Sequence, residues 1–412
     1  MAARLKVLMS AYACRPGKGS EHEIGWQWTL HMARIHDVTV LTRRKSREAI
    51  EKELKRLGDA HPVPTFEYHE CNGLMLGLKA RVSSFVRVYY VAWQRSVRRR
   101  ISALVRRNHY DLLHHVTFSA YRYPTAIWGH GVPCIWGPIG GIETVPAAFM
   151  PRRSPRALLY ELGRGTTNFM QESHLGGVAR KAGRSDLTVA CTEEMHRLLR
   201  KLGVDARLMA SVGMAPTRFP DRDLGLRKGP LRILYVGNII PLKGLDLGLE
   251  ALGASQTDAR FTLIGDGEFL AGAKRLTRKL GLSERVEFRG RLPQAATLAA
   301  YPDFDLLLFP SLHDTGGYAV LEAMANSLAV VCLAVGGPAL MVNGHCGFKI
   351  PLGRRDEVVS GLASAIQTYD RDRELLRAHG KGARQVVLKD FNWDTRAEKM
   401  NEFYQEVIAR QK

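Results

Sequence analysis

The chain has 412 residues, too many for one ordinary hydrophobic core, so two or three domains are predicted. Its composition, with 45% hydrophobic and 24% charged residues, excludes a chain that is disordered throughout. The net charge of +20 favours an anionic partner: a nucleic acid, an acidic membrane surface or a phosphorylated small molecule.

The first half of the chain alternates strand-like and helix-like runs. The run LKVLMSAYA, residues 5–13, is predicted to be a buried strand rather than a weak signal peptide. The loop CRPGKGS and a helix from Glu21 to about Arg34 follow, then the strand DVTVLTRR and a helix over 46–57. Further strands are predicted at 111–118, 133–139 and 186–192. This order is typical of a parallel sheet with crossover helices.

A basic stretch interrupts the alternation between Asn72 and Tyr110, where the sequence has no Asp or Glu. Nine residues within 79–107 are Lys or Arg. Apolar residues recur there at helical spacing and predict one apolar stripe. The stripe consists of Val82, Phe85, Val86, Tyr89, Trp93, Val97, Ile101 and Leu104. Two interpretations stay open: a core-packed helix with a solvated basic face, or an interfacial helix on anionic lipid.

The pattern restarts after residue 230. Strands are predicted at 232–238, 260–266, 285–290, 305–311 and 328–335. The segment 216–230 is rich in proline, glycine and charge, which is typical of a linker. We therefore predict domains at 1–215 and 231–394, with the helix at 395–412 returning to the first domain. Ligands of such sheets bind at the carboxyl ends of the strands.

Several kinds of site are not expected from the sequence. The six cysteines are scattered without a C-x-x-C pair, which fits a reducing cytosol rather than a disulfide framework or a zinc site. The sequence DRD at 221–223 mimics a D-x-D metal motif, but it lies in the predicted linker beside prolines. No RNP-type or helix-turn-helix signature accompanies the basic charge, so no nucleic acid is expected. The longest apolar run, LAVVCLAVGGPALM, is too short to span a bilayer.

Two acids flank a glycine pair between a strand-like and a helix-like run. Asp314 precedes Gly316 and Gly317, and Glu322 follows one turn into the predicted helix. Glycines let backbone N–H groups approach a ligand, and a helix N-terminus attracts anions. Carboxylates are good acceptors for sugar hydroxyls, so a nucleotide sugar, with hydroxyls at both ends and phosphates between, would fit. From the residues alone, a helix-capping Asp314 and a surface Glu322 stay an equal alternative.

Motifs along nearly the whole chain resemble the family 4 retaining glycosyltransferases of the GT-B fold, in which two Rossmann-like domains face across a cleft. FPSLHDTGGYAVLEAMA resembles the core signature of that family, with D-x7-E in place of E-x7-E. LYVGNIIPLKGLD and LIGDGE resemble its phosphate-binding loop and its glycine loop. CRPGKGSEHEIGWQW, LLHHVTFSAYRYP and IWGPIGGIE match a subset that is often tied to surface polysaccharides.

The resemblance implies a role for each matching residue. Glu322 would bind the ribose hydroxyls of the donor, and Asp314 would contact the transferred sugar. Lys243 would neutralise the diphosphate leaving group. Other residues implied around the donor are Gly17, Gly19, Asn238, Gly265, Arg289, Gly316 and Gly317. A histidine after the fourth N-terminal strand usually reaches the active site, and either His114 or His115 would do so, because adjacent strand residues face opposite ways.

The sequence departs from the family at Asp314, where Glu is usual, and at Asn238, where Arg is common. The implied activity is transfer of a sugar, with retention, from a nucleotide diphosphate sugar to an acceptor hydroxyl, without metal or cofactor. The acceptor would be a lipid-linked or growing glycan, met in the cytoplasm or at the inner face of the cytoplasmic membrane through residues 79–107. Two alternatives are a nucleotide-sugar isomerase of the 2-epimerase type and a catalytically weakened partner protein.

Overall fold

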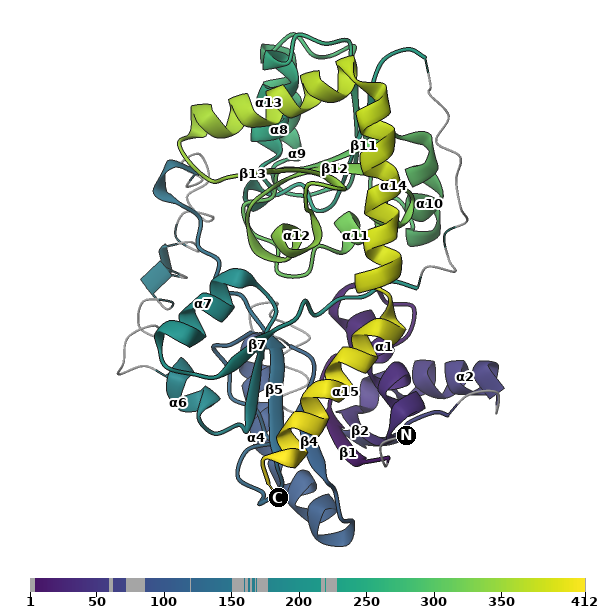
Figure 1. Ribbon diagram of the computed structural model, residues 1–412, viewed down its shortest axis with the longest axis vertical. Helices are drawn as coiled ribbons and strands as arrows, with labels where there is room; N and C mark the ends of the chain where they lie inside the picture. The colour runs from purple at the N-terminus through teal and green to yellow at the C-terminus, as the bar shows by residue number, and fades with distance from the viewer. Residues whose placement is uncertain are drawn as a thin grey trace. The chain divides into compact units, whose positions relative to one another are not determined.

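The chain divides into two compact α/β units (Figure 1). The computed structural model describes residues 4–58, 62–71, 86–118, 120–149, 159, 162, 163, 165, 166, 168, 177–215, 219 and 228–411. The N-terminal unit comprises Met1–Ile142, Asn168–Ser211 and Trp393–Lys412. The C-terminal unit comprises Glu143–Thr167 and Val212–Asn392. Most of the predicted linker, including the DRD sequence, lies outside the described residues.

The N-terminal unit is built on a parallel sheet of seven strands. Their order across the sheet is β3 (Thr65–His69), β2 (Asp37–Arg43), β1 (Lys6–Ser10), β4 (Leu112–His115), β5 (Cys134–Ile139), β6 (Leu187–Ala190) and β7 (Ala206–Leu208). Its helices are α1 (Ser20–Ile35), α2 (Arg47–Leu57), α4 (Val86–Arg107), α6 (Val178–Ala182), α7 (Glu193–Lys201) and α15 (Trp393–Ala409), with a 3-10 turn at Arg44–Ser46. The central strands β4 and β5 are buried along their whole length, as apolar runs in a parallel sheet predict.

The last helix, α15, lies beside α1 (Figure 1). The Trp28 and Trp393 rings pack edge to face with centroids 5.4 Å apart. Arg34 Nη1 lies 2.7 Å from Asp394 Oδ1. The end of the chain therefore completes the N-terminal unit.

Helix α4 packs its apolar stripe into the N-terminal core. The fully buried members are Tyr89, Trp93, Val97 and Ile101, and Leu104 is 5% exposed. Val86 at the first position is 36% exposed, and Val82 and Phe85 lie outside the described residues. The core-packed interpretation is thus confirmed over 86–107. Insertion of this apolar stripe into lipid is excluded for these residues, because the core covers it. Contact of the basic face with an anionic membrane stays a prediction.

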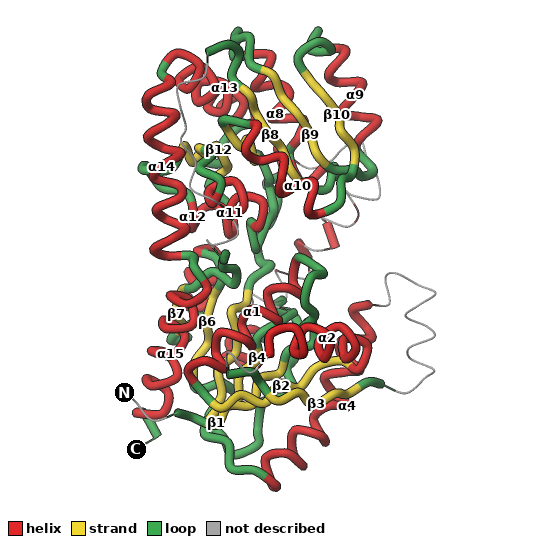
Figure 2. Tube along the Cα trace, turned by 90° about the vertical axis from the view of Figure 1, so that its right-hand side faces the viewer, coloured by secondary structure: helices red, strands yellow, loops and turns green. Residues whose placement is uncertain are grey.

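The C-terminal unit holds a second parallel sheet, and Figure 2 shows β8, β9 and β10 as neighbours in it. The strand order is β10 (Val286–Gly290), β9 (Arg260–Ile264), β8 (Arg232–Val236), β11 (Leu306–Phe309), β12 (Ala329–Leu333) and β13 (Gly347–Ile350). Its helices are α8 (Leu245–Ala254), α9 (Leu270–Lys279), α10 (Gln294–Ala300), α11 (Tyr318–Ala325), α12 (Gly336–Met341), α13 (Arg355–Arg371) and α14 (Arg373–Asp390). Short 3-10 turns lie at Ala147–Phe149, Pro241–Lys243 and Tyr301–Asp303. Both predicted parallel sheets are therefore present.

The observed division differs from the predicted one at the segment that follows β5. Val145 and Phe149, 3% and 6% exposed, join the C-terminal core although they precede β6 and β7 in the chain. The sequence prediction had kept all residues up to 215 in the first domain. The chain therefore enters the C-terminal unit, returns, and enters it again.

Candidate functional site

Lys243 and Asp314 meet at the carboxyl edge of the C-terminal sheet. Lys243 ends the 3-10 turn after β8, and Asp314 lies in the loop after β11, the hydrogen-bonded neighbour of β8. Lys243 Nζ lies 2.5 Å from Asp314 Oδ2 and 3.2 Å from the carbonyl oxygen of His313. The two side chains are 16% and 20% exposed. This ion pair is largely shielded from water, so its attraction is stronger than that of a surface pair.

Gly244 explains why Lys243 comes so close to the loop after β11. Its φ is +60°, a left-handed conformation that glycine adopts without strain. A Cβ atom at this position would lie 2.0 Å from the carbonyl oxygen of Pro310. The turn can therefore approach the 310–314 loop only because residue 244 has no side chain.

The carboxylate of Asp314 also organises the start of α11. Asp314 Oδ1 accepts hydrogen bonds from the backbone N–H groups of Gly316 at 3.1 Å and Gly317 at 2.7 Å. Burial raises the pKa of Asp314, but the Lys243 charge and the two N–H groups outweigh it, so the pKa lies below its ordinary value. Asp314 is therefore ionised at neutral pH. The two amides predicted to meet a ligand are engaged by this carboxylate.

Two glycines at the start of α12 contact the backbone of the Asp314 loop. A Cβ on Gly336, whose φ is +62°, would lie 2.2 Å from the carbonyl oxygen of Asp314. The N–H of Gly337 donates to that same oxygen at 2.8 Å. The loop is thus held on both sides, by Lys243 and by the start of α12.

Glu322 is not a surface acid, so the alternative of a surface Glu322 is wrong. Its Oε2 accepts a 2.7 Å hydrogen bond from the hydroxyl of Tyr301, which is fully buried in the turn before β11. Burial raises the pKa of Glu322 to about 7, and the Tyr301 hydrogen bond opposes the rise. The site therefore contains one carboxylate held ionised and one whose charge changes near neutral pH.

Glu143 is a site residue that the sequence reasoning missed. It belongs to the C-terminal unit, and its side chain is fully buried. Its Oε2 lies 3.4 Å from the Thr315 hydroxyl and 3.6 Å from His313 Nδ1, on either side of Asp314 in the chain. Tyr301 was missed in the same way. No motif spacing in the sequence indicates either residue, because each of them is distant in the chain from the residue that it contacts.

Asn238 and Gly265 share the carboxyl edge with Lys243. Asn238 is exposed after β8, and its carbonyl accepts a hydrogen bond from Tyr235 at 2.9 Å. Gly265 follows β9 at φ +152°, and a Cβ there would lie 1.8 Å from the carbonyl oxygen of Gly237. Their position agrees with the predicted donor loop, and their contacts to a ligand stay predictions.

Arg289 lies within β10, on the far side of β9 from Lys243. Its Nε is 3.1 Å from Glu287 Oε2, and its guanidinium lies 5.6 Å from the centroid of the Phe304 ring. These contacts explain its position without a ligand. A role in holding a nucleotide base stays a prediction.

Gly17 and Gly19 lie in the N-terminal unit, in the loop between β1 and α1, and both have φ of +68°. The N–H of Gly17 donates to Glu23 Oε2 at 2.8 Å, and Gln27 donates to the other oxygen of Glu23. The loop is thus tied to the first turns of α1. Nothing lies within 4 Å of a Cβ built on Gly17.

His114 and His115 face opposite sides of β4, as predicted. His114 Nδ1 lies 2.6 Å from the Tyr404 hydroxyl of α15, and its Nε2 lies 2.8 Å from the carbonyl oxygen of Gly137. His115 Nδ1 lies 3.0 Å from the Thr125 hydroxyl. Burial lowers the pKa of His114 to about 4 and that of His115 to about 3, so both are neutral at pH 7. That one of them reaches a ligand stays a prediction.

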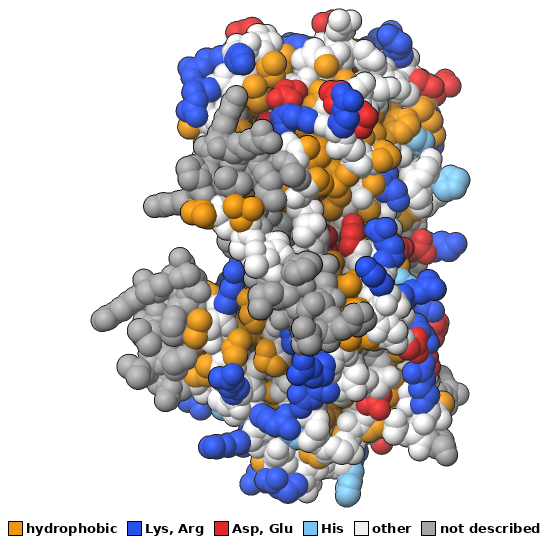
Figure 3. Space-filling view, turned by 90° about the vertical axis from the view of Figure 1, so that its left-hand side faces the viewer, with side chains coloured by type: hydrophobic (Ala, Val, Ile, Leu, Met, Phe, Trp, Pro, Cys, Tyr) orange, Lys and Arg blue, Asp and Glu red, His pale blue; other side chains and the backbone are white. Residues whose placement is uncertain are grey.

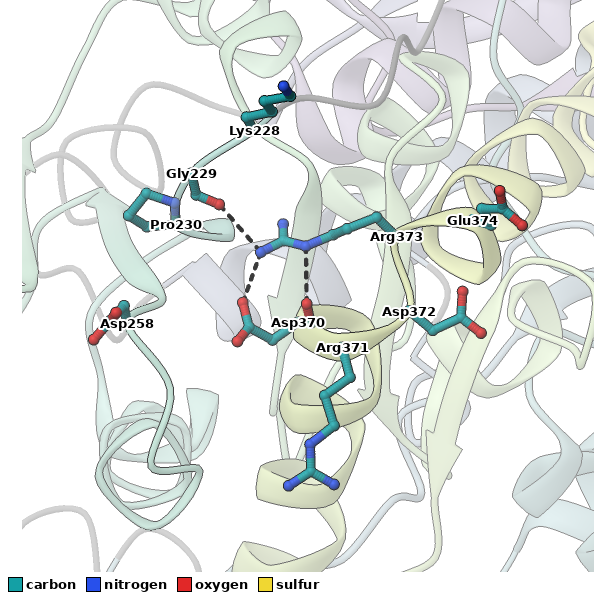
Figure 4. A pocket seen from close by; sticks show the side chains of 9 residues that line it. All are labelled: Lys228, Gly229, Pro230, Asp258, Asp370, Arg371, Asp372, Arg373 and Glu374. Carbon is teal, nitrogen blue, oxygen red and sulfur yellow. Dashed lines mark hydrogen bonds and ion pairs between the residues drawn. The ribbon is translucent and has the colours of Figure 1, made fainter.

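A separate hollow lies at the opposite, amino edge of the C-terminal sheet (Figure 4). Its volume is about 950 Å³, and its lining residues are Lys228, Gly229, Pro230, Asp258, Asp370, Arg371, Asp372, Arg373 and Glu374. Figure 4 shows Arg373 reaching between Asp370 and the carbonyl of Gly229, at 2.6 and 3.3 Å. Ligands of parallel sheets bind at the carboxyl edge, so this hollow is a weaker candidate than the Lys243 site.

Neither a metal cluster nor a membrane-spanning helix occurs in the described part of the chain. No three His, Cys, Asp or Glu side chains among the described residues are grouped so that they could hold a metal ion. No helix in those ranges is long and apolar enough to cross a bilayer.

The family described as glycosyl transferases group 1 matches residues 218–386, which include Lys243, Asp314 and Glu322. A putative colanic acid biosynthesis glycosyltransferase, WcaL, from Salmonella typhimurium is 28% identical over 222 residues, 51% of this chain and 54% of that protein. A D-inositol 3-phosphate glycosyltransferase from Streptomyces bingchenggensis is 30% identical over 256 residues, 56% of this chain and 55% of that protein. The chain thus spans about half the length of these curated relatives.

Solved structures match the fold over nearly the whole chain. Anabaena Alr3699/HepE in complex with UDP-glucose has a TM-score of 0.61 at 17% identity and covers 98% of this chain and 100% of its own. Sucrose-phosphate synthase from Thermosynechococcus elongatus has a TM-score of 0.63 at 18% identity, with coverages of 99% and 100%. At such identities the likeness shows the fold, and it confirms the predicted pair of Rossmann-like sheets.

Proposed function

Because the chain belongs to the group 1 glycosyltransferases, family 4 with the GT-B fold, we propose that it is a retaining glycosyltransferase. It transfers a sugar from a nucleotide diphosphate sugar to an acceptor hydroxyl. The C-terminal unit holds the donor, and the N-terminal unit holds the acceptor. The reaction uses no metal and no cofactor.

The arrangement of Lys243, Asp314 and Glu322 carries this proposal. A cation and an ionised acid meet 2.5 Å apart at the carboxyl edge of a parallel sheet, and a second acid lies on the helix that follows. The ammonium group of Lys243 would stabilise the negative charge that grows on the leaving diphosphate. Asp314 would accept hydrogen bonds from the transferred sugar, and Glu322 from the ribose.

The proposed chemistry is a transfer on one face of the sugar. A mechanism in which the acceptor attacks the face that the diphosphate leaves needs no carboxylate nucleophile. The departing phosphate oxygen takes the acceptor proton, the C–O bond to the acceptor forms, and the bond to the diphosphate breaks. Lys243 favours each of these changes because it stabilises the diphosphate more as its charge increases.

We propose a uridine nucleotide as the first donor to test. The support is the fold match to Anabaena HepE, which was solved with UDP and with UDP-glucose. A thermal-shift panel of nucleotide sugars tests the choice, because a ligand that binds the folded state raises its melting temperature. A shift with uridine and none with guanosine nucleotides is expected, and the reverse would contradict it.

The proposed acceptor is a lipid-linked or growing glycan of surface polysaccharide synthesis. Support comes from the colanic acid name of the Salmonella relative and from the fold match to the lipopolysaccharide galactosyltransferase WaaB, with a TM-score of 0.61. WaaB is 14% identical, so its contribution is an analogy of fold.

We propose further that the protein works in the cytoplasm and meets the inner face of the cytoplasmic membrane by charge alone. Lys and Arg side chains gather on the part of the N-terminal unit seen in Figure 3, and the described part of the basic stretch is helix α4. Each basic group near an anionic surface contributes about 1 kcal/mol before screening. Flotation with anionic vesicles is expected at low salt and lost at high salt; no flotation at low salt would contradict the contact.

The alternatives are a 2-epimerase-type isomerase and a nucleotide-sugar-binding partner protein that has lost activity. Release of UDP from UDP-sugar, and chromatography of the sugar nucleotide that remains, separate them when both are measured with and without acceptor. A transferase releases UDP faster with acceptor. An epimerase changes its donor without acceptor, and a binding protein releases no UDP in either condition.

A further inference from the structure

A cationic cluster lies at the carboxyl edge of the N-terminal sheet, away from the Lys243 site in the chain. Arg43 is the last residue of β2, and the loop between β1 and α1 follows the neighbouring strand. The cationic cluster is defined by Arg15 and Lys18 of that loop, Arg43, and Lys45 of the turn after β2.

Arg43 is the unusual member, because its residue is only 7% exposed. Its Nε donates to the carbonyl of Tyr12 at 3.0 Å, and its guanidinium lies over the Tyr12 ring, 4.3 Å from the centroid. Its Nη2 lies 2.9 Å from His22 Nε2. Since a guanidinium only donates, His22 Nε2 is the acceptor and carries no proton. Among the described residues, Arg43 forms no ion pair with a carboxylate.

The other members add positive charge to the same place. Lys18 Nζ lies 3.5 Å from the same nitrogen of His22. Burial lowers the pKa of Lys18. Three neighbouring cations lower it further: Arg43, Lys45 and Arg15. Lys18 therefore lies in a field of neighbouring positive charges.

Two acids near this cluster, Glu70 and Glu23, are already engaged. Glu70 accepts from the hydroxyl of Tyr89 and, at 3.3 Å, from the backbone N–H of Lys45. Glu23 accepts from Gly17 and Gln27. A buried guanidinium without a counter-ion is unfavourable, so an anionic ligand would stabilise the arrangement.

We propose that the N-terminal unit binds a phosphate group of the acceptor at this cationic cluster. Arg43 is held rigidly by Tyr12 and His22, which suits the planar recognition of phosphate oxygens, and Lys18 and Lys45 add exposed, mobile charges. The inference rests on the proposed transferase function only in assigning the phosphate to the acceptor. It narrows the acceptor to a phosphorylated glycan or an isoprenyl-phosphate-linked one.

The test uses the full chain and radiolabelled inorganic phosphate in equilibrium dialysis at low salt. Saturating unlabelled UDP is present so that the donor site is occupied. One phosphate per chain is expected to bind. Absence of bound phosphate under these conditions would contradict the proposal, because the anion would then have no site apart from the one that UDP occupies.

The variants are matched in charge. Lys18→Gln with Lys45→Gln removes two exposed members of the cluster, and an affinity loss of about tenfold or more is expected. Lys52→Gln with Lys55→Gln removes the same charge from exposed positions on α2 and is expected to bind phosphate as the wild type does. Equal binding by both double variants would overturn the proposal. Arg43→Lys keeps the charge but loses the planar guanidinium group, so weaker binding of phosphate is expected.

Two competitors distinguish the source of the phosphate. A soluble sugar phosphate and an isoprenyl monophosphate in neutral vesicles are each added against the labelled phosphate. Displacement by either supports the proposal and identifies the acceptor class, and displacement by neither contradicts it. Binding of labelled UDP is measured in parallel, so a failure of the donor assignment is separable from a failure of this inference.

Discussion

The carboxyl edges of the two sheets differ in whether their cationic side chains are paired with an acid. At the C-terminal sheet, Lys243 is matched by Asp314 at 2.5 Å, and the acid is further held by two backbone N–H groups. At the N-terminal sheet, Arg43 is 93% buried with an aromatic ring and a neutral histidine as partners. The first edge is complete without a ligand, whereas the second has positive charge in excess.

The difference indicates how each edge would use binding energy. An ion pair between a lysine and an acid costs the folded protein little free energy. The same lysine can also stabilise a negative charge that develops during the reaction. An unbalanced cluster gains most when an anion arrives, so it suits recognition of a charged group that is present from the start. The predictions below test each side of this contrast.

Removal of the Lys243 ammonium group should have the largest effect on activity. Lys243→Ala is expected to lower kcat/KM by about a thousandfold, because the leaving diphosphate loses its cation. Sugar transfer is measured by UDP release. Lys274→Ala is the matched control, since each lysine lies 5.7 Å from the centroid of an aromatic ring, Lys243 over Phe309 and Lys274, on α9, over Phe288. Equal loss in both variants would contradict the role of Lys243.

Two glycines with similar positive φ angles, +60° at Gly244 and +68° at Gly17, should differ in their tolerance of a side chain. Gly244→Ala introduces a Cβ 2.0 Å from a carbonyl oxygen and is expected to lower the free energy of unfolding by about 3 kcal/mol or more. Gly17→Ala meets nothing within 4 Å and should cost about 1–2 kcal/mol from its left-handed backbone alone. Urea denaturation measures both. Similar losses would show that the close approach at Gly244 does not hold in solution.

Glu322 should make stability fall as pH rises. Its pKa is about 7 when folded, against an ordinary value of 4.5, so the folded state holds the proton more tightly. The stabilisation is complete below pH 4.5 and is lost as pH rises through 7, with a change of roughly 2–3 kcal/mol. Glu322→Gln should lack this slope. Denaturation at pH 5 and pH 8 checks it; parallel curves for wild type and variant would exclude the shift.

The buried histidines should give the opposite slope. Their folded pKa values, about 4 for His114 and about 3 for His115, lie below the ordinary 6.5. Their contribution to stability is present above pH 6.5 and is lost as pH falls toward 4. His114→Gln should weaken the acid dependence between those values. An unchanged acid transition would show that His114 does not remain buried and neutral.

The smallest effect is expected at Glu143. Glu143→Gln keeps the shape of the side chain but removes the charge beside His313 and Thr315. The Asp314 loop should then be positioned less accurately, although its reacting groups are unchanged. A fall in kcat of about tenfold with a nearly unchanged donor KM is expected. Steady-state kinetics separates the two parameters. A rise in KM alone would place Glu143 in donor binding instead.

The sequence predicted the interior strands and the edge strand β10, whose observed bounds are Val286–Gly290, but it missed the other three edge strands. β1, β4, β5, β11 and β12 are apolar runs, and each was located within a few residues. β3, β7 and β13 were missed. β7 has only three residues, and β3 and β13 are partly exposed edge strands without continuous apolar runs, so their pairing depends on a neighbour that local sequence does not reveal.

The site residues were predictable where they belong to a short motif next to a predicted strand or helix. Lys243, Asp314 and Glu322 stand at fixed positions after strands and at a helix start, so a motif identifies them. Glu143 enters the site from a segment that follows β5 of the other unit, and Tyr301 reaches Glu322 from another turn. The burial of the α4 stripe in the core depended in the same way on tertiary packing that periodicity alone leaves open.

Calorimetric titration with UDP tests the central claim most directly. Wild type and Lys274→Ala are expected to bind UDP with equal affinity, whereas Lys243→Ala and Glu322→Ala should each bind about tenfold more weakly or worse. Circular dichroism first establishes that all four proteins are folded. Unchanged UDP affinity in both site variants would contradict the assignment of the donor to the Lys243, Asp314 and Glu322 site.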